Sequence, residues 1–310
     1  MECDEMKDQQ TKNQNTKTQQ AIGIVGLGSM GYGMAMTLLR EGFTVYGLDP
    51  SFEQQEAAKA LGVTVVPDTE SLCLAVDNIL LSLPTAKHVQ SVIEGEGGII
   101  EHAKPNTLIM DTTTSEPDVT RCLAEKLNRF GHQMLDCPLS GGAAGASAGT
   151  MVILVGGAPE ALERATPYLD ALSAKTVHLG KSGSGHVAKL VNNLLCAAHL
   201  VTTAEAITLG VKAGLDPELL IDGLNAGSGR SAISEVNFPR WVLNESFDSG
   251  FTAQLMRKDL GLAKQLIEEC QLSLPVSEDV TQIWSDSKDT VSGSEDFNRI
   301  VDYVRKEANS

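Results

Sequence analysis

The sequence predicts an α/β fold in which a doubly wound, mainly parallel sheet domain is followed by an all-helical domain. Between residues 21 and 179 short apolar runs alternate with segments of helical period, and from residue 185 onward only helical patterns remain. A chain of 310 residues has room for two domains. We expect the sheet domain at residues 21–182 and the helical domain at 183–310. Residues 1–20 are rich in Gln, Asn, Lys and Thr and are expected to form a disordered tail.

The elements of the sheet domain follow from apolar runs separated by turn residues. Strands are expected at 21–25, 43–48, 63–66, 78–83, 107–110, 133–136, 151–155 and 176–179. Helices are expected from the first glycines to residue 39 and at 53–61, 70–76, 89–93, 117–130 and 159–172. The Gly/Ala/Ser-rich segment from Ser140 to Gly149 is expected to be a loop.

The helical domain is expected to consist of segments at 186–213, 217–226, 255–270, 275–287 and 297–305. Its first segment is apolar on all sides, so it is expected to be buried between domains or between subunits.

The stretch GLGSMG at residues 26–31 combines a strand, a tight turn and a helix start, which is the pattern of a dinucleotide-binding unit. Gly26 would make the turn, Gly28 would let the backbone approach a pyrophosphate, and Gly31 would let the helix pack closely on the strand. The first N–H groups of that helix, with the positive end of its dipole, favour phosphate. We therefore predict that Gly26, Gly28, Ser29, Met30 and Gly31 contact a dinucleotide.

Asp49 stands about 20 positions after these glycines, at the end of the second predicted strand. An acid there can bond the ribose 2′-hydroxyl and would repel a 2′-phosphate. No Arg or Lys follows Asp49 before Lys59. The predicted cofactor is NAD, and NADP is the less favoured alternative.

Two further segments follow predicted strands and could line the nicotinamide half of the cleft. These are Leu83–Pro84 and Thr112–Thr114, because ligands of such sheets lie outside the carboxyl ends of the strands. Both have a purely structural alternative, since Pro often follows a strand, and Asp111 with the three threonines could cap the helix at 117–130.

Lys189 and Asn193 share one face of the first helix of the second domain, and Asn192 adjoins them. A Lys and two Asn within an apolar helix are costly to bury without partners. Burial would lower the pKa of Lys189 towards neutrality, as a general acid/base requires. The alternative is that Lys189 extends to the surface and that the Asn pair caps a neighbouring loop.

Composition argues against several classes of protein. With 40 acidic and 24 basic residues the net charge is −16, which disfavours nucleic-acid and anionic-membrane partners. Six scattered cysteines form no CxxC pair, which fits a reducing cytoplasm and predicts neither a disulfide framework nor a metal site. No apolar run approaches the ~18 residues of a membrane span, and no signal or mitochondrial presequence is recognised, so we expect a cytoplasmic protein.

Five motifs in order resemble the β-hydroxyacid dehydrogenase family, with the nearest likeness to 3-hydroxyisobutyrate dehydrogenases. They are GLGSMGYGMA at 26–35, DCPLSGG at Asp136–Gly142, GKSGSGHVAKLVNN at 180–193, NAGSGRS at 225–231 and LMRKDLGLA at 255–263. The resemblance runs from about residue 21 to the C-terminus. It implies a Rossmann domain, a helical second domain, a homodimer or homotetramer built on the long helix, and no metal.

The resemblance also assigns roles to matching residues. Lys189 matches the catalytic lysine, which takes the hydroxyl proton during oxidation and protonates the carbonyl oxygen during reduction. Asn193 matches the residue that holds the substrate near that lysine, and the adjoining Asn192 is predicted to bind the substrate as well. Ser140, Gly141 and Gly142 match the loop that binds the substrate carboxylate. The cofactor-side contacts of the family match Leu83, Pro84, Thr114 and Lys258.

The sequence departs from the family at two places. Cys137 and Leu139 stand where Ala and Val are usual, and Cys137 is interpreted as an apolar filler rather than a nucleophile. Ser231–Ala232 replaces Cys-Trp, which should leave a wider or wetter pocket. His186 is interpreted as a turn residue, with a proton relay as the alternative.

Three functions are compatible with this pattern. The favoured one is an NAD-dependent oxidoreductase that acts on a small anionic 3-hydroxyacid or its semialdehyde. The second is an NADPH-dependent reductase of tartronate semialdehyde, succinic semialdehyde or glyoxylate. The third is a dinucleotide-binding protein without turnover, against which the presence of Lys189 and Asn193 argues.

Overall fold

The computed structural model describes residues 20–308, which divide into two compact units. The first unit runs to Lys189 and the second begins at Leu190, so the division falls inside one long helix. The disordered tail predicted for residues 1–20 lies outside the described residues except for Gln20. The Gln20 carbonyl accepts a hydrogen bond from the Thr44 N–H (3.1 Å), so residue 20 already belongs to the sheet unit.

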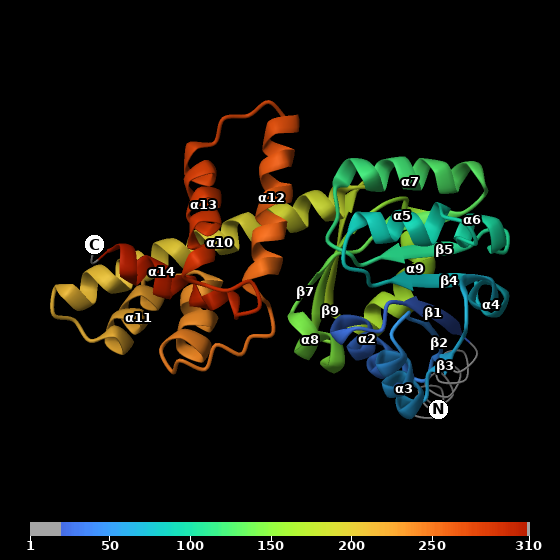
Figure 1. The fold of residues 1–310 in the computed structure, drawn as a ribbon, viewed down its shortest axis with the longest axis horizontal. Coiled ribbons are helices and arrows are strands. Elements are labelled where there is room, and N and C mark those ends of the chain that lie inside the picture. The colour runs from blue at the N-terminus through green and yellow to red at the C-terminus, as the bar shows by residue number, and fades with distance from the viewer. Residues whose placement is uncertain (1–19, 309–310) are drawn as a thin grey trace, which may run out of the picture. The chain divides into compact units, whose positions relative to one another are not determined.

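The first unit is built on one sheet (Figure 1). Its strands are β1 (Ala21–Val25), β2 (Thr44–Leu48), β3 (Thr64–Val65), β4 (Asn78–Leu81), β5 (Leu108–Asp111), β6 (Gln133–Asp136), β7 (Leu139–Ser140), β8 (Met151–Gly156) and β9 (Ser173–Gly180). The strand order is β3-β2-β1-β4-β5-β6-β8-β7, and β9 lies beside β8. Strands β1 to β6 pair in parallel, whereas β8 runs antiparallel to β6 and β7.

Helices cover both faces of this sheet. One buried core joins the sheet to α2 (Ser29–Arg40), α3 (Phe52–Leu61), α8 (Gly142–Ala148) and α9 (Pro159–Leu172). A second core joins it to α4 (Thr69–Ala75), α5 (Ala86–Glu94), α6 (Ile99–His102) and α7 (Pro117–Arg129). Strand β4 serves both cores, because Leu80 packs in the first while Ile79 and Leu81 pack in the second. The predicted doubly wound architecture is confirmed.

The second unit is helical, as predicted. It comprises the larger part of α10 (Ser184–Lys212) together with α11 (Pro217–Ala226), η1 (Ile233–Val242), α12 (Ala253–Glu269), α13 (Pro275–Asp286), η2 (Ser287–Asp289), η3 (Phe297–Arg299) and α14 (Ile300–Glu307). Its core surrounds the fully buried Trp284, whose indole N–H lies 3.4 Å from the Ala197 carbonyl. The Arg257 guanidinium joins α12 to the end of α13 through the carbonyl of Trp284 (2.9 Å).

The loop predicted from Ser140 to Gly149 is wrong in part, because it contains strand β7 and helix α8. The two glycines of the α8 sequence, GAAGASA, disfavour a helix although its alanines favour one, and its small side chains let it pack closely against α2. A Cβ at Gly33 would lie 3.0 Å from the Ala146 Cβ, and the Thr37 hydroxyl donates to the Ala146 carbonyl (2.7 Å). The contacts with α2 therefore stabilise helix α8. Elements α6, η1 and η2 were not predicted from the sequence.

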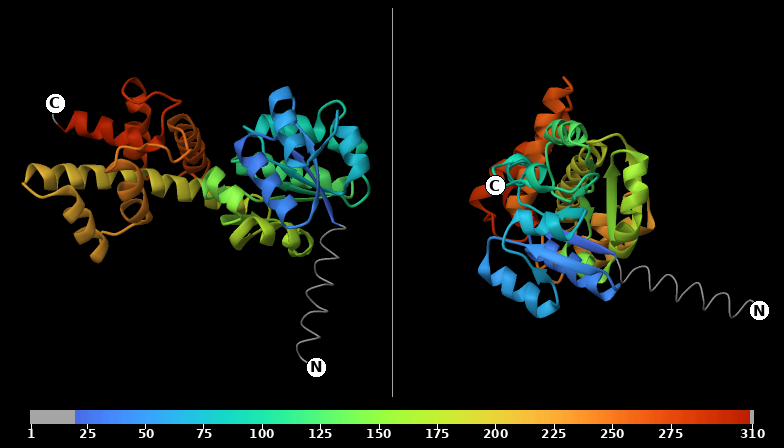
Figure 2. Two further views of the ribbon diagram at one scale, coloured as in Figure 1. Left: turned by 90° about the horizontal axis from the view of Figure 1, so that it is seen from below. Right: turned by 90° about the vertical axis from the view of Figure 1, so that its right-hand side faces the viewer.

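Helix α10 is one uninterrupted element of 29 residues (Figure 2). Among the described residues it is the one helix long and apolar enough to cross a membrane, by length and composition alone. The expectation that no segment passes this test was wrong, because it counted uninterrupted apolar runs and polar residues such as Asn193 and Glu205 interrupt this one. Core helices of soluble proteins pass the same test.

Candidate active site

The predicted cofactor-binding residues of the first unit gather at one edge of the sheet. Strands β2, β1, β4, β5 and β6 are parallel neighbours, so their carboxyl ends face the same way. Asp49, Gly26 and Leu83 follow the ends of the first three strands, and Thr112–Thr114 and Cys137–Ser140 follow the ends of the last two. This is the edge at which ligands bind in open α/β sheets.

The glycine-rich turn between β1 and α2 is crowded at two positions and open at a third. A Cβ at Gly26, where φ is +93°, would lie 2.2 Å from the Ser82 carbonyl oxygen. A Cβ at Gly31 would lie 1.9 Å from the Gly26 carbonyl oxygen. A Cβ at Gly28 would meet nothing within 4 Å, and Gly28 is the exposed N-cap of α2 without a side chain to cap it. This cradle at a helix N-terminus fits a pyrophosphate.

Asp49 connects this turn to the end of β2. Its carboxylate accepts hydrogen bonds from the Leu27 N–H (2.7 Å) and the Ser51 N–H (2.8 Å). Since a carboxylate has about four acceptor positions, two remain for a ligand hydroxyl. Asp49 is 9% exposed, so its charge disfavours a second anion at this position.

The threonines after β5 fix the end of β4. The Thr112 hydroxyl donates to the Leu81 carbonyl (2.7 Å), and the Thr113 hydroxyl accepts from the Leu83 N–H (3.2 Å). The alternative that Asp111–Thr114 cap α7 is wrong, because its N-cap is Glu116, without a side-chain cap hydrogen bond. Pro84 is exposed and Thr114 is half-buried at this edge.

The Ser140–Gly142 segment turns sharply from β7 into α8. Gly141 (φ +130°) is the N-cap of α8, and Gly142 (φ +63°) is its first residue. Both glycines are exposed and Ser140 is half-buried. A hydroxyl beside exposed N–H groups at a helix start is suited to a carboxylate.

Lys189 lies in the second turn of α10 and is 8% exposed. The alternative in which it extends to the surface is therefore excluded by its burial. Asn193, one turn further along the helix, is 5% exposed. The two side chains share a helix face, as the spacing predicted.

In the second unit, Asn193 is held by Asp259, a residue that the sequence analysis did not single out. The Asn193 amide nitrogen donates to the buried Asp259 carboxylate (2.7 Å), and its oxygen accepts from the exposed Asn192 (3.1 Å). The Asp259 carboxylate also lies 3.5 Å from the Lys258 ammonium. The signal was present in the sequence as the acid next to Lys258 in LMRKDLGLA.

The structure supports the interpretation of Cys137 and contradicts that of His186. Burial and the neighbouring carboxylates of Asp136 and Asp111 raise the pKa of the Cys137 thiol well above its ordinary value, which supports its interpretation as a filler. His186 is not a turn residue, because it lies within α10, is fully buried and pairs with the Thr120 hydroxyl (2.8 Å).

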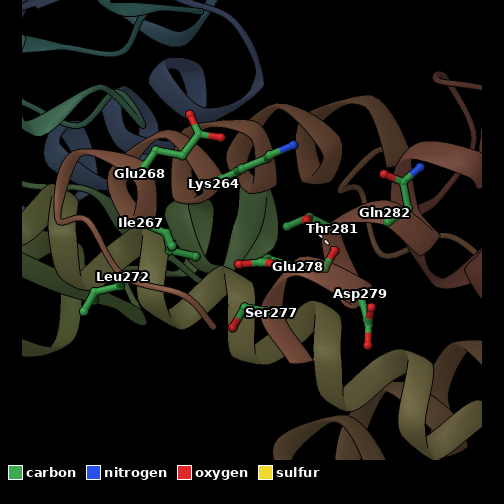
Figure 3. Close-up of a pocket in the computed structure, with 9 residues that line it drawn as sticks. All are labelled: Lys264, Ile267, Glu268, Leu272, Ser277, Glu278, Asp279, Thr281 and Gln282. Atoms are coloured by element: carbon green, nitrogen blue, oxygen red, sulfur yellow. Dashed lines mark hydrogen bonds between the residues drawn. The ribbon is translucent and has the colours of Figure 1, made fainter. Parts of the chain in front are cut away.

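A groove of about 480 Å³ lies elsewhere, between α12 and α13 (Figure 3). It is lined by Lys264, Ile267, Glu268, Leu272, Ser277, Glu278, Asp279, Thr281 and Gln282. None of the predicted site residues belongs to this lining.

Sequence comparison identifies both units. Residues 21–180 match the NAD-binding domain of 6-phosphogluconate dehydrogenase, and residues 183–304 match the NAD-binding domain of NADP-dependent 3-hydroxyisobutyrate dehydrogenase. The chain is 36% identical to 2-(hydroxymethyl)glutarate dehydrogenase of Eubacterium barkeri over 280 residues, which cover 90% of this chain and 93% of that protein. The chain belongs to the β-hydroxyacid dehydrogenase family. It is an NAD(P)-dependent oxidoreductase that acts on CH–OH groups of hydroxyacids.

Two further dehydrogenases are similar to this chain over most of its length. The NAD-dependent L-serine dehydrogenase of Pseudomonas aeruginosa is 35% identical over 262 residues, covering 82% of this chain and 88% of that one. The structure of 3-hydroxyisobutyrate dehydrogenase from Mycobacterium tuberculosis with L-serine aligns with a TM-score of 0.85 at 30% identity, covering 92% and 99% of the two chains.

The crowding at Gly31 and the open space at Gly28 predict different effects when a Cβ is added at each position. Gly31→Ala should destabilise the protein by roughly 1–3 kcal/mol or prevent folding, because its Cβ would strike backbone. Gly28→Ala should fold like wild type but bind dinucleotide at least about tenfold more weakly, because its Cβ would occupy the open approach. Thermal unfolding and calorimetric titration measure the two effects. Unchanged binding by Gly28→Ala would contradict this location of the pyrophosphate.

Proposed function

We propose that this enzyme oxidises, with NAD, small acids of the form HOCH₂–CH(R)–COO⁻. The substrates in the names of the three relatives support this class, because 3-hydroxyisobutyrate, L-serine and 2-(hydroxymethyl)glutarate all contain this unit. They differ only in R, which is methyl, ammonium or carboxyethyl. The shared unit contains the hydroxyl that is oxidised and the carboxylate that is bound.

The observation that carries the proposal is a buried lysine on an apolar helix. Lys189 is 8% exposed, so its amine is withdrawn from bulk water, as suits a group that exchanges a proton with a bound substrate. Asn193, one turn away, is fixed by its hydrogen bond to Asp259 and so offers a polar group of set orientation.

In the proposed oxidation, the nicotinamide, when bound, would accept the hydride that leaves C3 of the substrate. The Lys189 amine takes the hydroxyl proton as the C3 carbonyl forms, and in the reverse direction the Lys189 ammonium returns a proton to that oxygen. Ser140 and the N–H groups at Gly141 and Gly142 bind the substrate carboxylate. Asn193 holds the substrate hydroxyl beside Lys189.

We propose NAD as the preferred cofactor because of Asp49. Its buried carboxylate already holds Leu27 and Ser51 at the position that a 2′-phosphate would approach. Pro50 and Ser51 follow Asp49, so no cation of this segment neutralises such a phosphate. The second unit matches the NAD-binding domain of an NADP-dependent 3-hydroxyisobutyrate dehydrogenase, so the cofactor preference has to be measured for this chain itself.

We propose further that R is larger or more polar than methyl. Ser231 and Ser234 bond each other reciprocally, with Ser231 N–H to Ser234 Oγ at 2.8 Å and Ser234 N–H to Ser231 Oγ at 3.2 Å. This serine pair lies at the start of η1, whose N-cap is the exposed Ala232. The bulky indole of other family members is replaced by small side chains.

A substrate and cofactor screen tests this proposal. Purified enzyme should oxidise 2-(hydroxymethyl)glutarate or L-serine with a higher kcat/KM than 3-hydroxyisobutyrate, and should use NAD at least about tenfold better than NADP. The panel includes 3-hydroxypropionate and glycerate, which contain the HOCH₂–CH(R)–COO⁻ unit, and threonate and 4-hydroxybutyrate, which lack it. Exclusive activity on 4-hydroxybutyrate, or better use of NADP, would refute the corresponding part of the proposal.

Replacement of the buried lysine tests the mechanism. Lys189→Ala should lower kcat ~10²–10⁴-fold while dinucleotide binding persists, because the acid/base group is lost and the cofactor edge is untouched. Lys212→Ala, at the exposed end of the same helix, is the matched control and should keep wild-type rates. A loss below about tenfold in a folded Lys189→Ala protein would remove this lysine from the reaction.

We propose a homodimer or homotetramer. Large apolar side chains on α10 remain exposed in the single chain, among them Val191 (48%), Leu195 (53%) and Leu209 (72%). Light scattering should give a particle mass of at least twice the 32.9 kDa of one chain, and a monomer at micromolar concentration would contradict the proposal.

A further inference from the structure

We infer that Asp136 is a positioning residue for the reaction, because it anchors the start of the helix that carries Lys189. The inference rests on the proposed role of Lys189. We call Asp136, Gly183, His186 and Thr120 the α10 anchor; all four belong to the first unit.

The carboxylate of Asp136 caps α10 from outside the helix. Its two oxygens accept hydrogen bonds from the Gly183 N–H (2.7 Å) and the His186 N–H (3.0 Å). Since α10 begins at Ser184, these donors are the residue before the helix and its third residue. They are two of the N–H groups that a helix leaves without an intrahelical partner. A capping box satisfies the same two donors with two local side chains, and here one carboxylate from strand β6 does so.

Two glycines make room for this contact. A Cβ at Gly156 would lie 2.6 Å from one Asp136 carboxylate oxygen and 2.7 Å from the other. A Cβ at Gly185 would lie 2.9 Å from the second oxygen and 2.6 Å from the Leu154 carbonyl oxygen. Strand β8 and the first turn of α10 therefore enclose the carboxylate tightly, so a shift of Asp136 requires a shift of the helix.

The charged and polar side chains of the α10 anchor are buried and hydrogen-bonded. Asp136 is fully buried, and a buried carboxylate is stabilised here by N–H donors and by the positive end of the helix dipole. His186 is also fully buried, and its Nδ1 atom pairs with the Thr120 hydroxyl on α7 (2.8 Å). The first turn of α10 is thus tied to β6 through its backbone and to α7 through a side chain.

The anchor connects the two groups that the proposed reaction must bring together. Lys189 follows His186 by three residues, so it lies on the next turn of the anchored helix, ~4.5 Å along its axis. Asp136 is also the last residue of β6, and Ser140 follows it by four residues. Asp136 therefore fixes the start of the helix that carries Lys189 and also begins the segment that leads to Ser140.

The test is Asp136→Asn, which keeps the size of the side chain but presents an NH₂ group to one of the two N–H donors. We expect kcat to fall about 10- to 100-fold with dinucleotide affinity within about twofold of wild type, since small misplacements of reacting groups have effects of this size. The primary deuterium isotope effect on kcat with C3-deuterated substrate should rise, because hydride transfer becomes slower. Amide hydrogen exchange of residues 183–189 should accelerate.

Asp216→Asn is the matched control. Asp216 also accepts two helix N–H groups, from Glu218 and Leu219 (both 3.0 Å), but it caps α11, which carries no predicted site residue. It should leave kcat and the isotope effect unchanged. A role of Asp136 in stability alone would lower activity only in proportion to the folded fraction and would leave the isotope effect of Asp136→Asn at the wild-type value.

A second variant covers the case in which Asp136→Asn does not fold. Thr120→Val removes the hydroxyl that holds His186 and nearly conserves volume, and it should raise the isotope effect with a loss in kcat of about two- to tenfold. A wild-type isotope effect in whichever of these variants folds overturns the inference. If Lys189→Ala retains activity, the proposed function fails instead, and the hydrogen-exchange result for the anchor still stands.

Discussion

The parallel pairing of β2, β1, β4, β5 and β6 is the constraint on which the site depends. Parallel strands require crossover helices, so every strand delivers its carboxyl end to the same edge and every connection starts there. Residues as far apart in the chain as Gly26, Leu83 and Thr113 become neighbours in this way. The close approach of Gly31 to the Gly26 carbonyl then fixes the start of α2 at that edge, where a phosphate can meet unpaired N–H groups.

Three buried acids serve as hydrogen-bond acceptors that hold other groups in place. Asp49 holds the glycine-rich turn, Asp136 holds the start of α10, and Asp259 holds Asn193. Each accepts from N–H donors, which offsets the desolvation of its charge. Asp111 is a fourth buried acid of the first unit, and burial raises the pKa of its carboxyl.

How much of the structure could be predicted from the sequence depended on how far apart along the chain the interacting residues lie. The positions of the Gly26–Gly31 turn and of Asp49 at the end of β2 were predictable because they follow from local order along the chain, strand then turn then helix then acid. The shared face of Lys189 and Asn193 was predictable from helical period alone. The roles of Asp136 and Asp259 were not, because their partners are 47 to 66 residues away and only the fold brings them together. Helix α8 was missed since packing on α2, rather than its own sequence, forms it.

The proposed chemistry assigns the reaction to one ammonium group and one cofactor, with the rest of the site holding them in place. The most direct measurement follows the hydride itself. Enzyme incubated with NAD⁺ and an acid of the HOCH₂–CH(R)–COO⁻ class, deuterated at C3, should yield NADH one mass unit heavier than from unlabelled substrate, with an aldehyde that retains one deuterium. Reduced cofactor without the label, or no reduced cofactor with any acid of this class, would contradict the account.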